Sequence, residues 1–589
     1  MSKPDNSFNA MGATPAEWLA QASNPQAWQS LMQMAQAGKH NLPAMPAIPN
    51  MPNMPATAAH VPPEKMAALQ KDYTEEMAAL WSGLMASRTP QVKDRRFSTP
   101  AWQDSPLYEF NAATYLLNAR FMNALADAVE TDANTKKKIR FATQQAIAAM
   151  SPSNFLATNP EAQKKLIDSK GESLSKGIMQ MVADMRKGHI SQTDETAFEV
   201  GVNVATTEGA VVYENKLIQL LQYKPLGKQV YQRPLLVVPP CINKFYILDL
   251  QPENSLIRYA VEQGHTVFVV SWVNPDESLA HLGWDDYIQH GVIDAIEVVQ
   301  DISAEKQINT LGFCVGGTLL AAALAVLAEQ GKKPAASLTL LTAMLDFTDV
   351  GAIDVYVDET QVSQREQSIG AGGLMPGRDF ASAFSSLRPN DLVWNYVESN
   401  YLKGEEPTAF DLLYWNSDST NLPGPMFCYY LRNMYLENRM KTPGQLQVDG
   451  YPVDLSKIQV PAFVYASRED HIVPWATAYA TTALINKGKP GNTQFVLGAS
   501  GHIAGVINPP AKNKRYYFEN NKIAATANEW LEGAKQIPGS WWPDYTKWLE
   551  QFGGEQKPAS TTFGNAKYKK MEAAPGVYVK EKATPEINQ

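Results

Sequence analysis

Cysteine, histidine and long apolar stretches are all scarce in this sequence. Its 589 residues include three cysteines, Cys241, Cys314 and Cys428, which are too few for a disulfide framework and are spaced unlike any zinc site. The longest apolar run, residues 319–328, is much shorter than the ~20 residues that a membrane-spanning helix needs. The N-terminus lacks the basic head and apolar segment of a signal peptide. We therefore expect a reduced, cytoplasmic protein without a transmembrane segment or a bound metal.

Basic residues are also fewer than acidic ones, with 51 Lys and Arg against 60 Asp and Glu. The net charge is −9 and the pI is about 5.6, so the composition gives no support to a general nucleic-acid-binding protein. The hydrophobic content of 44%, over a chain of this length, is sufficient for a large buried core.

Composition and spacing divide the chain into three parts. Residues 1–63 end in a stretch rich in Pro, Met and Ala, which predicts a flexible arm and linker. Residues 64–199 carry apolar side chains at helical spacing, for example Met66 and Leu69, and predict a helical N-terminal domain that holds no catalytic group. Residues 200–589 are expected to form a catalytic domain.

From about residue 200, short apolar runs alternate with helical segments. Runs that are apolar at successive positions are typical of strands buried on both faces, and helices between them indicate an α/β fold with a mainly parallel sheet. The expected strands lie within residues 233–240, 265–272, 308–314, 337–346, 460–470 and 492–502.

The segment LGFCVGG, residues 311–317, has the G-x-S-x-G spacing of a hydrolase nucleophile turn, with cysteine in place of serine. A strand-like run precedes it and an apolar helical run follows it, as a strand–turn–helix requires. Gly312 and Gly316 suit the close backbone approach at such a turn, and the positive end of the helix would face the sulfur. We therefore predict an α/β-hydrolase-type fold with Cys314 as the nucleophile. A buried cysteine beside packing glycines is the alternative.

Eight histidines are available to serve as the base. Six of them lie in linker, helical or crossover segments or at the opening of a strand, namely His40, His60, His189, His265, His281 and His290. His471 and His502 each follow a late strand, and open α/β sheets place ligands at the carboxyl ends of their strands. The chain order of this architecture, which is nucleophile, acid and then histidine, favours His502 as the base. His471 is expected to support it from the neighbouring shell of residues.

The same chain order places the acid after a strand that precedes His502. Asp470 lies in the polar turn SREDHIVPW after the penultimate expected strand, and we predict that it orients and charges the imidazole. Asp346 also ends an expected strand and is the alternative acid. The apolar residue that follows Asp346 makes it the weaker candidate.

An acyl-transfer site also needs two backbone N–H donors for the oxyanion. Val315, directly after the nucleophile, is expected to supply one of them. The other should come from the loop VPPCINKFY, where the two prolines have no N–H, so Cys241 or Ile242 is the nearest donor and we favour Ile242. Cys241 is either a second thiol near the site or a small packing residue.

The interval between the fourth and fifth expected strands is far longer than a crossover connection requires. It contains the glycine-rich residues 368–380 and several aromatic segments. We interpret residues of about 350–455 as a lid inserted beside the site. An additional helical layer that gates nothing is the alternative.

A cysteine nucleophile restricts the reactions that the site is expected to catalyse. An acyl group moved between two sulfurs stays near energetic balance, and a thioester on the enzyme remains reactive toward an incoming hydroxyl. Cys314 therefore favours a transferase that takes acyl groups from thioesters and passes them to an alcohol. A plain esterase does not need sulfur at this position.

Several long strings of the sequence resemble the polyhydroxyalkanoate synthases. They are VVPPCINKFYILDL, GFCVGG, SLRPNDLVWNYV, NLPGPMF, SREDHIVPW and ASGHIAGVINPPAKNKR. The similarity runs from roughly residue 95 to 580, and the chain length and the string NFLATNP are similar to the class I, single-subunit type.

This resemblance implies an acyltransferase that polymerises (R)-3-hydroxyacyl-CoA, with 3-hydroxybutyryl-CoA as the expected monomer, and releases CoA. Cys314 would hold the growing polyester chain as a thioester, His502 would deprotonate Cys314, and Asp470 would assist His502 or activate the hydroxyl of the monomer. The resemblance also implies a homodimer at the surface of cytoplasmic polymer granules, and no cofactor. An acyl-CoA thioesterase or esterase on the same scaffold is the alternative.

Overall fold

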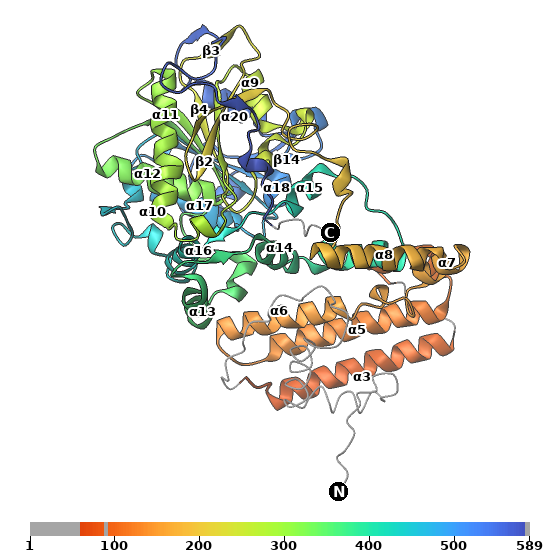
Figure 1. Cartoon of the computed structure of the whole chain (residues 1–589). Coiled ribbons are helices and arrows are strands. Elements are labelled where there is room, and N and C mark those ends of the chain that lie inside the picture. Colours follow the sequence, from red (N-terminus) through yellow and green to blue (C-terminus); the bar gives the residue numbers. More distant parts are fainter. Residues whose placement is uncertain (1–58, 87–91, 584–589) are drawn as a thin grey trace. The chain divides into compact units, whose positions relative to one another are not determined.

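The computed structural model describes residues 59–86 and 92–583 (Figure 1), all of which belong to one compact unit, Met51–Gln589. Nearly all of the predicted arm and linker, residues 1–63, lies outside the described residues and stays a prediction. Within the described part, none of the helices combines the length and the apolar character needed to span a bilayer.

The first described segment of the chain is helical, as the sequence predicted. Its helices are α3 (Pro63–Met85), α4 (Pro100–Gln103), α5 (Pro106–Ala128), α6 (Ala133–Ala149), α7 (Pro160–Asp168) and α8 (Glu172–Lys187). The helix α5 packs between α3 and α6. Asp132 and Asn159 begin α6 and α7 by accepting backbone N–H groups of the first turn, which satisfies donors that have no partner within the helix.

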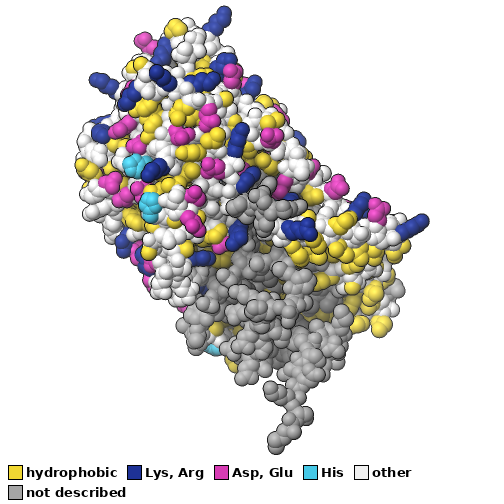
Figure 2. Space-filling model, in the orientation of Figure 1, with side chains coloured by type: hydrophobic (Ala, Val, Ile, Leu, Met, Phe, Trp, Pro, Cys, Tyr) yellow, Lys and Arg dark blue, Asp and Glu magenta, His cyan; other side chains and the backbone are white. Residues whose placement is uncertain are grey.

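Part of this helical surface is apolar and exposed. The large apolar side chains that remain exposed on α7 and α8 are Ile167, Ile178, Met179, Val182 and Met185. Figure 2 shows hydrophobic side chains gathered over this region. Ile178, Val182 and Met185 recur at helical spacing and so share one face of α8. Contiguous apolar surface of this kind is typical of an interaction site.

An eleven-stranded sheet forms the second part of the chain. Its strands are β1 (Gly209–Glu214), β2 (Ile218–Tyr223), β4 (Leu235–Val238), β5 (Val267–Trp272), β6 (Ile308–Phe313), β7 (Ala335–Leu341), β12 (Ala462–Ser467), β13 (Thr493–Gly498), β14 (Tyr516–Glu519), β15 (Lys535–Pro538) and β17 (Glu572–Ala573). Their spatial order is β15-β14-β13-β12-β7-β6-β4-β5-β2-β1-β17.

The six central strands, from β13 to β5, run parallel. They are the six strands that the apolar runs predicted, so the expected α/β fold with a parallel sheet is confirmed. The flanking strands pair antiparallel and were not predicted. The strand β15, with the sequence KQIP, is mostly exposed and has no apolar run to mark it. The strand β17 pairs with β1 from the far end of the chain.

Helices cover both faces of the sheet. Alternate residues of β4 enter two different hydrophobic clusters, Leu236 and Val238 in one and Leu235 and Val237 in the other, as the period of two in a strand requires. The first cluster contains α11 (Asp294–Ser303) and α12 (Val315–Glu329), and the second contains α9 (Leu256–Glu262) and α20 (Trp542–Glu550). The apolar run within α12 is buried along nearly its whole length, because the helix is covered on all sides.

Between β7 and β12 the chain forms helices instead of a single crossover. These are α13 (Glu359–Ile369), α14 (Gly377–Ser386), α15 (Asp411–Ser417) and α16 (Gly424–Tyr430), together with the short pair β8 (Leu374–Met375) and β9 (Leu422–Pro423). The buried ammonium of Lys138 on α6 pairs with Asp358 at the start of α13. The role of this insertion as a lid stays a prediction.

Candidate active site

Cys314 occupies the turn between β6 and α12. Its backbone has φ 53° and ψ −130°, a conformation that costs a non-glycine residue ~1–3 kcal/mol and persists only where the surroundings enforce it. The Cys314 N–H donates to the carbonyl oxygen of Leu341 on β7 at 2.9 Å, and its own carbonyl accepts the N–H of Gly317 at 2.8 Å. The partly exposed sulfur therefore lies on a strained strand–turn–helix of the kind that presents a nucleophile.

The glycines around this turn are required by close backbone contacts. A Cβ on Gly312 would lie 2.4 Å from the Cα of Gly317, and one on Gly316 would lie 2.2 Å from the carbonyl oxygen of Val238. A Cβ on Gly317 would approach the Cβ of Ala343 at 2.6 Å. Real Cβ contacts do not occur at these distances, so the turn closes against β4 and the end of β7 only because these side chains are absent.

His502 and Asp470 form a buried pair. The Nδ1 atom of His502 lies 2.6 Å from the Oδ2 atom of Asp470, and the side chains are 6% and 0% exposed. The other carboxylate oxygen, Oδ1, accepts the backbone N–H groups of Ile472 and Val473, each at 2.9 Å. The Phe313 ring stacks against the imidazole with centroids 5.7 Å apart. The carboxylate is thus fixed in orientation, and it fixes the imidazole in turn.

The strand order brings this pair to the cysteine. Cys314, Asp470 and His502 follow the carboxyl ends of β6, β12 and β13, which lie in one parallel stretch of the sheet. Burial by itself would lower the pKa of His502. The charge of Asp470 and then that of Cys314, each with a hydrogen bond to the imidazole, raise the pKa of His502 to about 10. The imidazole therefore lies close enough to Cys314 for the charge of the thiolate to act on it.

The two rival residues are placed differently. Asp346 accepts the backbone N–H of Thr348 at 2.9 Å and the side-chain amide of Asn438 at 2.8 Å, so its carboxylate serves a separate network. His471 is half-buried, and burial lowers its pKa. Its backbone carbonyl accepts the N–H of Ala352. Of the two candidate carboxylates, Asp470 is the one that contacts His502.

The expected oxyanion donors lie on two adjoining segments. Val315 is the first residue of α12, where a backbone N–H has no partner within the helix. Ile242 lies in the loop after β4, and its carbonyl accepts the N–H of Thr420 at 3.4 Å. Cys241 is 1% exposed, and burial, with a further contribution from the nearby Cys314, raises its pKa far above the ordinary thiol range. The choice between Cys241 and Ile242 as the second donor stays a prediction.

Two tyrosines beside the sulfur were not singled out from the sequence. Tyr430 ends α16 and Tyr435 follows it, with ring centroids 5.3 Å apart in an edge-to-face arrangement. Burial raises the pKa of both phenols, and the nearby Cys314 raises it further. The aromatic string FCYYLRNMYL was the available signal, but spacing along the chain does not reveal that its tyrosines come near Cys314 in the fold.

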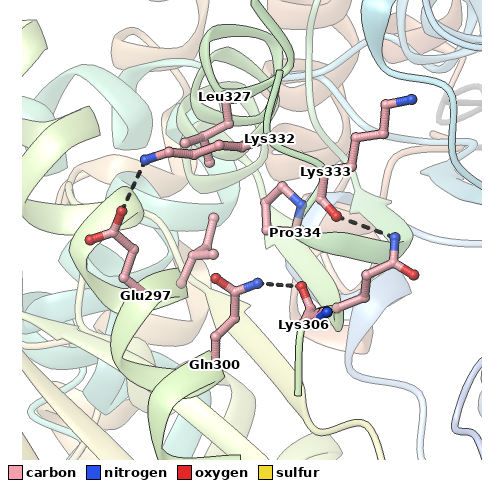
Figure 3. Close-up of a pocket in the computed structure, with 9 residues that line it drawn as sticks. Glu297, Gln300, Lys306, Leu327, Lys332, Lys333 and Pro334 are labelled. Atoms are coloured by element: carbon pink, nitrogen blue, oxygen red, sulfur yellow. Dashed lines mark hydrogen bonds and ion pairs between the residues drawn. The ribbon is translucent and has the colours of Figure 1, made fainter. Parts of the chain in front are cut away.

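A pocket of about 460 Å³ lies away from this site (Figure 3). Its lining includes residues 306–307 and 332–334, which directly precede β6 and β7. It therefore opens at the amino ends of the parallel strands, whereas Cys314 lies at their carboxyl ends. Lys332 reaches across it to Glu297 at 3.3 Å. Over the residues that the structure describes, no group of three or more His, Cys, Asp or Glu side chains is arranged to hold a metal ion.

Comparison with known families agrees with this geometry. Residues 234–509 match the family described as "alpha/beta hydrolase fold", which defines the class of the sheet. Residues 93–260 match the family described as "Poly-beta-hydroxybutyrate polymerase (PhaC) N-terminus".

Full-length relatives cover almost the whole chain. The chain is 55% identical to the poly(3-hydroxyalkanoate) polymerase subunit PhaC of Cupriavidus necator, over 97% of this chain and 95% of the relative. It is 40% identical to the subunit of the same name in Rhizobium meliloti, over 84% and 80% of the two chains. It is also 40% identical to a poly(3-hydroxyalkanoate) polymerase of Methylorubrum extorquens, over 88% of each. The chain belongs to the poly(3-hydroxyalkanoate) polymerase (PhaC) family, and it is an enzyme.

Proposed function

We propose that this enzyme is an acyltransferase that polymerises (R)-3-hydroxyacyl-CoA, with 3-hydroxybutyryl-CoA as the expected monomer, into a polyester and releases CoA. The observation that carries the proposal is the position of Cys314 near the buried His502–Asp470 pair. The relatives that match most of the chain are named as polymerases. A cysteine nucleophile with an imidazole base and an orienting carboxylate is an arrangement for acyl transfer through a covalent intermediate.

The first step loads the acyl group onto the enzyme. His502 accepts the proton of Cys314, and the thiolate attacks the thioester carbonyl of the substrate. The backbone N–H groups of Val315 and Ile242 stabilise the resulting oxyanion. When this intermediate collapses, the bond between the carbonyl carbon and the CoA sulfur breaks, and the CoA thiolate takes the proton from His502. The products are an acyl thioester on Cys314 and free CoA.

The second step forms the polymer bond. His502 accepts the proton of the hydroxyl of an incoming 3-hydroxyacyl-CoA, and the hydroxyl oxygen attacks the carbonyl of the chain held on Cys314. The new C–O ester bond forms as the C–S bond breaks, and the Cys314 thiolate recovers a proton from His502. The chain, now one unit longer and carried by CoA, returns to Cys314 by exchange between two sulfurs, which releases CoA.

Asp470 fits better as the partner of His502 than as a base for the hydroxyl. Its Oδ2 atom already contacts His502, and its Oδ1 atom is occupied by two backbone N–H groups. Its side chain is 0% exposed, so a substrate hydroxyl has no open carboxylate oxygen to approach. This supports an orienting and charge-balancing role.

The alternative activity is hydrolysis of acyl-CoA by water on the same scaffold. The names of relatives that span most of the chain support the polymerase over this thioesterase alternative. Incubation with 3-hydroxybutyryl-CoA separates the two: a polymerase gives free CoA and turbid, insoluble polyester, whereas a thioesterase gives free CoA and soluble 3-hydroxybutyrate. Cys314→Ala should abolish CoA release. Full activity in that variant would remove the basis of the proposal.

Homodimer formation and attachment to polymer granules are part of the same proposal. The exposed apolar side chains of α8, among them Met179 at 62% and Ile178 at 49% exposed, support a surface of this kind. Met179→Gln combined with Ile178→Gln should weaken sedimentation with polyester particles or shift the monomer–dimer equilibrium. Unchanged behaviour in both measurements would exclude α8 from these contacts.

A further inference from the structure

Lys244 is a buried lysine that the proposed chemistry does not use. It lies in the loop after β4, two residues beyond Ile242, and is 3% exposed. Its ammonium group donates to the backbone carbonyl oxygens of Glu581 and Tyr578. Lys244 therefore joins the loop that is expected to supply an oxyanion donor to residues 578–583 from the other end of the sequence.

A third segment, residues 418–421, lies between these two. The N–H of Thr420 donates to the Ile242 carbonyl at 3.4 Å. Asp418 forms an ion pair with Lys582 at 3.1 Å, and its charge also acts on Lys244. The side-chain amide of Asn421 donates to the carbonyl of Ala583 at 3.4 Å. Hydrogen bonds and an ion pair thus connect the three segments.

The carbonyl groups of the loop are held on both sides of the expected donor. Trp272 Nε1 donates to the Pro239 carbonyl at 2.9 Å, and Trp415 Nε1 donates to the Lys244 carbonyl at 2.7 Å. These two contacts hold the backbone of the loop at residues 239 and 244, on either side of Ile242. A Cβ on Gly316 would lie 2.5 Å from the Pro239 carbonyl oxygen, so the loop lies directly against the nucleophile turn.

We propose that Lys244 is a positioning residue for the oxyanion, and that residues 578–583 clamp it so that the loop holds its N–H donor toward the Cys314-bound acyl group. The proposal rests on the acyl-transfer function above. A buried ammonium needs acceptors for its protons, and here the acceptors are backbone carbonyls of the 578–583 segment. Burial lowers the pKa of Lys244 against the opposing charge of Asp418, which is consistent with a group held in a water-poor position.

The test compares Lys244→Met with Lys332→Met. The first variant keeps the length and apolar stem of the side chain, and the second removes a lysine from an exposed ion pair at the amino ends of the strands. We expect Lys244→Met to lower kcat for CoA release from 3-hydroxybutyryl-CoA by about 100-fold, as expected for loss of one oxyanion donor, with KM close to the wild-type value. Alkylation of Cys314 by iodoacetamide should keep its wild-type rate, because the His502–Asp470 pair is untouched.

Deletion of residues 581–589 removes the Glu581 carbonyl and tests the clamp independently. It should lower kcat similarly, and combining it with Lys244→Met should lower kcat little further, since both changes remove the same interaction.

Wild-type kcat in Lys244→Met, or additive losses in the combined variant, would overturn the proposal. A simultaneous loss of alkylation rate and thermal stability in Lys244→Met would also overturn it, because it would indicate general unfolding. If Lys244→Met does not fold, wild-type kcat in the deletion variant overturns it. Failure of the acyl-transfer function itself would appear as absent CoA release in the wild-type enzyme.

Discussion

His502 Nδ1 and Asp470 Oδ2 lie 2.6 Å apart in a pocket of the fold where neither side chain is open to solvent. The carboxylate is not free to rotate, because Ile472 and Val473 hold its second oxygen through their backbone N–H groups. The imidazole therefore keeps one ring nitrogen toward Asp470 and presents the other toward the remainder of the site. This relationship fixes the orientation of the His502 imidazole.

Asp470→Asn should reduce catalysis severely while the fold persists. The amide keeps the shape of the carboxylate but cannot balance the charge of a protonated imidazole, and it can stabilise the wrong tautomer. We expect kcat for CoA release to fall by about 1,000-fold or more, as in hydrolases whose orienting aspartate is replaced. Initial rates with 3-hydroxybutyryl-CoA, together with circular dichroism of the variant, measure this directly.

Asp346→Asn is the matched control, since Asp346 was the alternative acid. Its carboxylate contacts Thr348, Asn438 and Lys441, and we expect CoA release within a few-fold of the wild-type rate. If Asp346→Asn abolished activity while Asp470→Asn retained it, the assignment of the acid would be reversed.

The raised pKa of His502 predicts a pH dependence of stability. The pKa is about 10 in the folded protein and about 6.5 in an unfolded chain, so protonation favours the folded state. This contribution is fully present below about pH 6.5 and is lost as the pH rises toward about 10. Urea unfolding should show the free energy of unfolding of the wild type falling more steeply over this interval than that of His502→Gln. Parallel curves for the two proteins would contradict the raised pKa.

Gly316→Ala should disrupt the nucleophile turn. The new methyl group would lie 2.2 Å from the Val238 carbonyl oxygen and 2.5 Å from the Pro239 carbonyl oxygen. Displacing these backbone atoms would cost free energy, because the backbone is less free to move than a side chain. We expect a loss of stability of about 1–3 kcal/mol and loss of CoA release, measured by thermal unfolding and initial rates. A Cβ on Gly491 would meet nothing within 4 Å, so Gly491→Ala should stay within about 0.5 kcal/mol of the wild type.

Thiol labelling should single out one cysteine in the native enzyme. Cys314 is partly exposed, whereas Cys241 and Cys428 are 1% and 4% exposed. Burial raises the pKa of both buried thiols, that of Cys428 to about 11, and a protonated thiol is a poor nucleophile. Mass spectrometry after brief iodoacetamide treatment should show one adduct, on Cys314, and none in Cys314→Ala. An adduct on Cys241 at a comparable rate would require a second reactive thiol beside the site.

Two neighbouring ion pairs between α6 and the segment around α13 should differ in strength. Lys138 pairs with Asp358 with its side chain 3% exposed, whereas Lys137 pairs with Asp354 with its side chain 54% exposed. Asp358→Asn leaves a buried ammonium without its partner and should cost about 3 kcal/mol. Asp354→Asn, at an exposed pair, should cost at most about 1 kcal/mol. Urea unfolding of both variants measures the difference, and equal costs would show that burial does not govern these pairs.

The parallel part of the fold could be predicted because its signal is local. The run LLVV of β4 is buried at every position, and a strand covered on both faces must be apolar at successive positions. The antiparallel edge strands could not be predicted, because their identity depends on partners far away in the chain. Glu572 and Ala573 are paired with β1, and nothing in their own sequence indicates a strand.

The residues of the candidate site could be predicted from the sequence. The string LGFCVGG specifies a strained turn with a thiol, since only small residues permit its close contacts, and the chain order favoured His502 and Asp470. The chain order of the motifs left the identity of the acid open, and this could be read only from the folded chain. The tertiary structure paired Asp470 with His502 and engaged Asp346 with Asn438, because contact depends on where strand ends meet. Folding also placed Tyr430 and Lys244 near the loops around Cys314. Spacing along the chain carries no information about such contacts between distant segments.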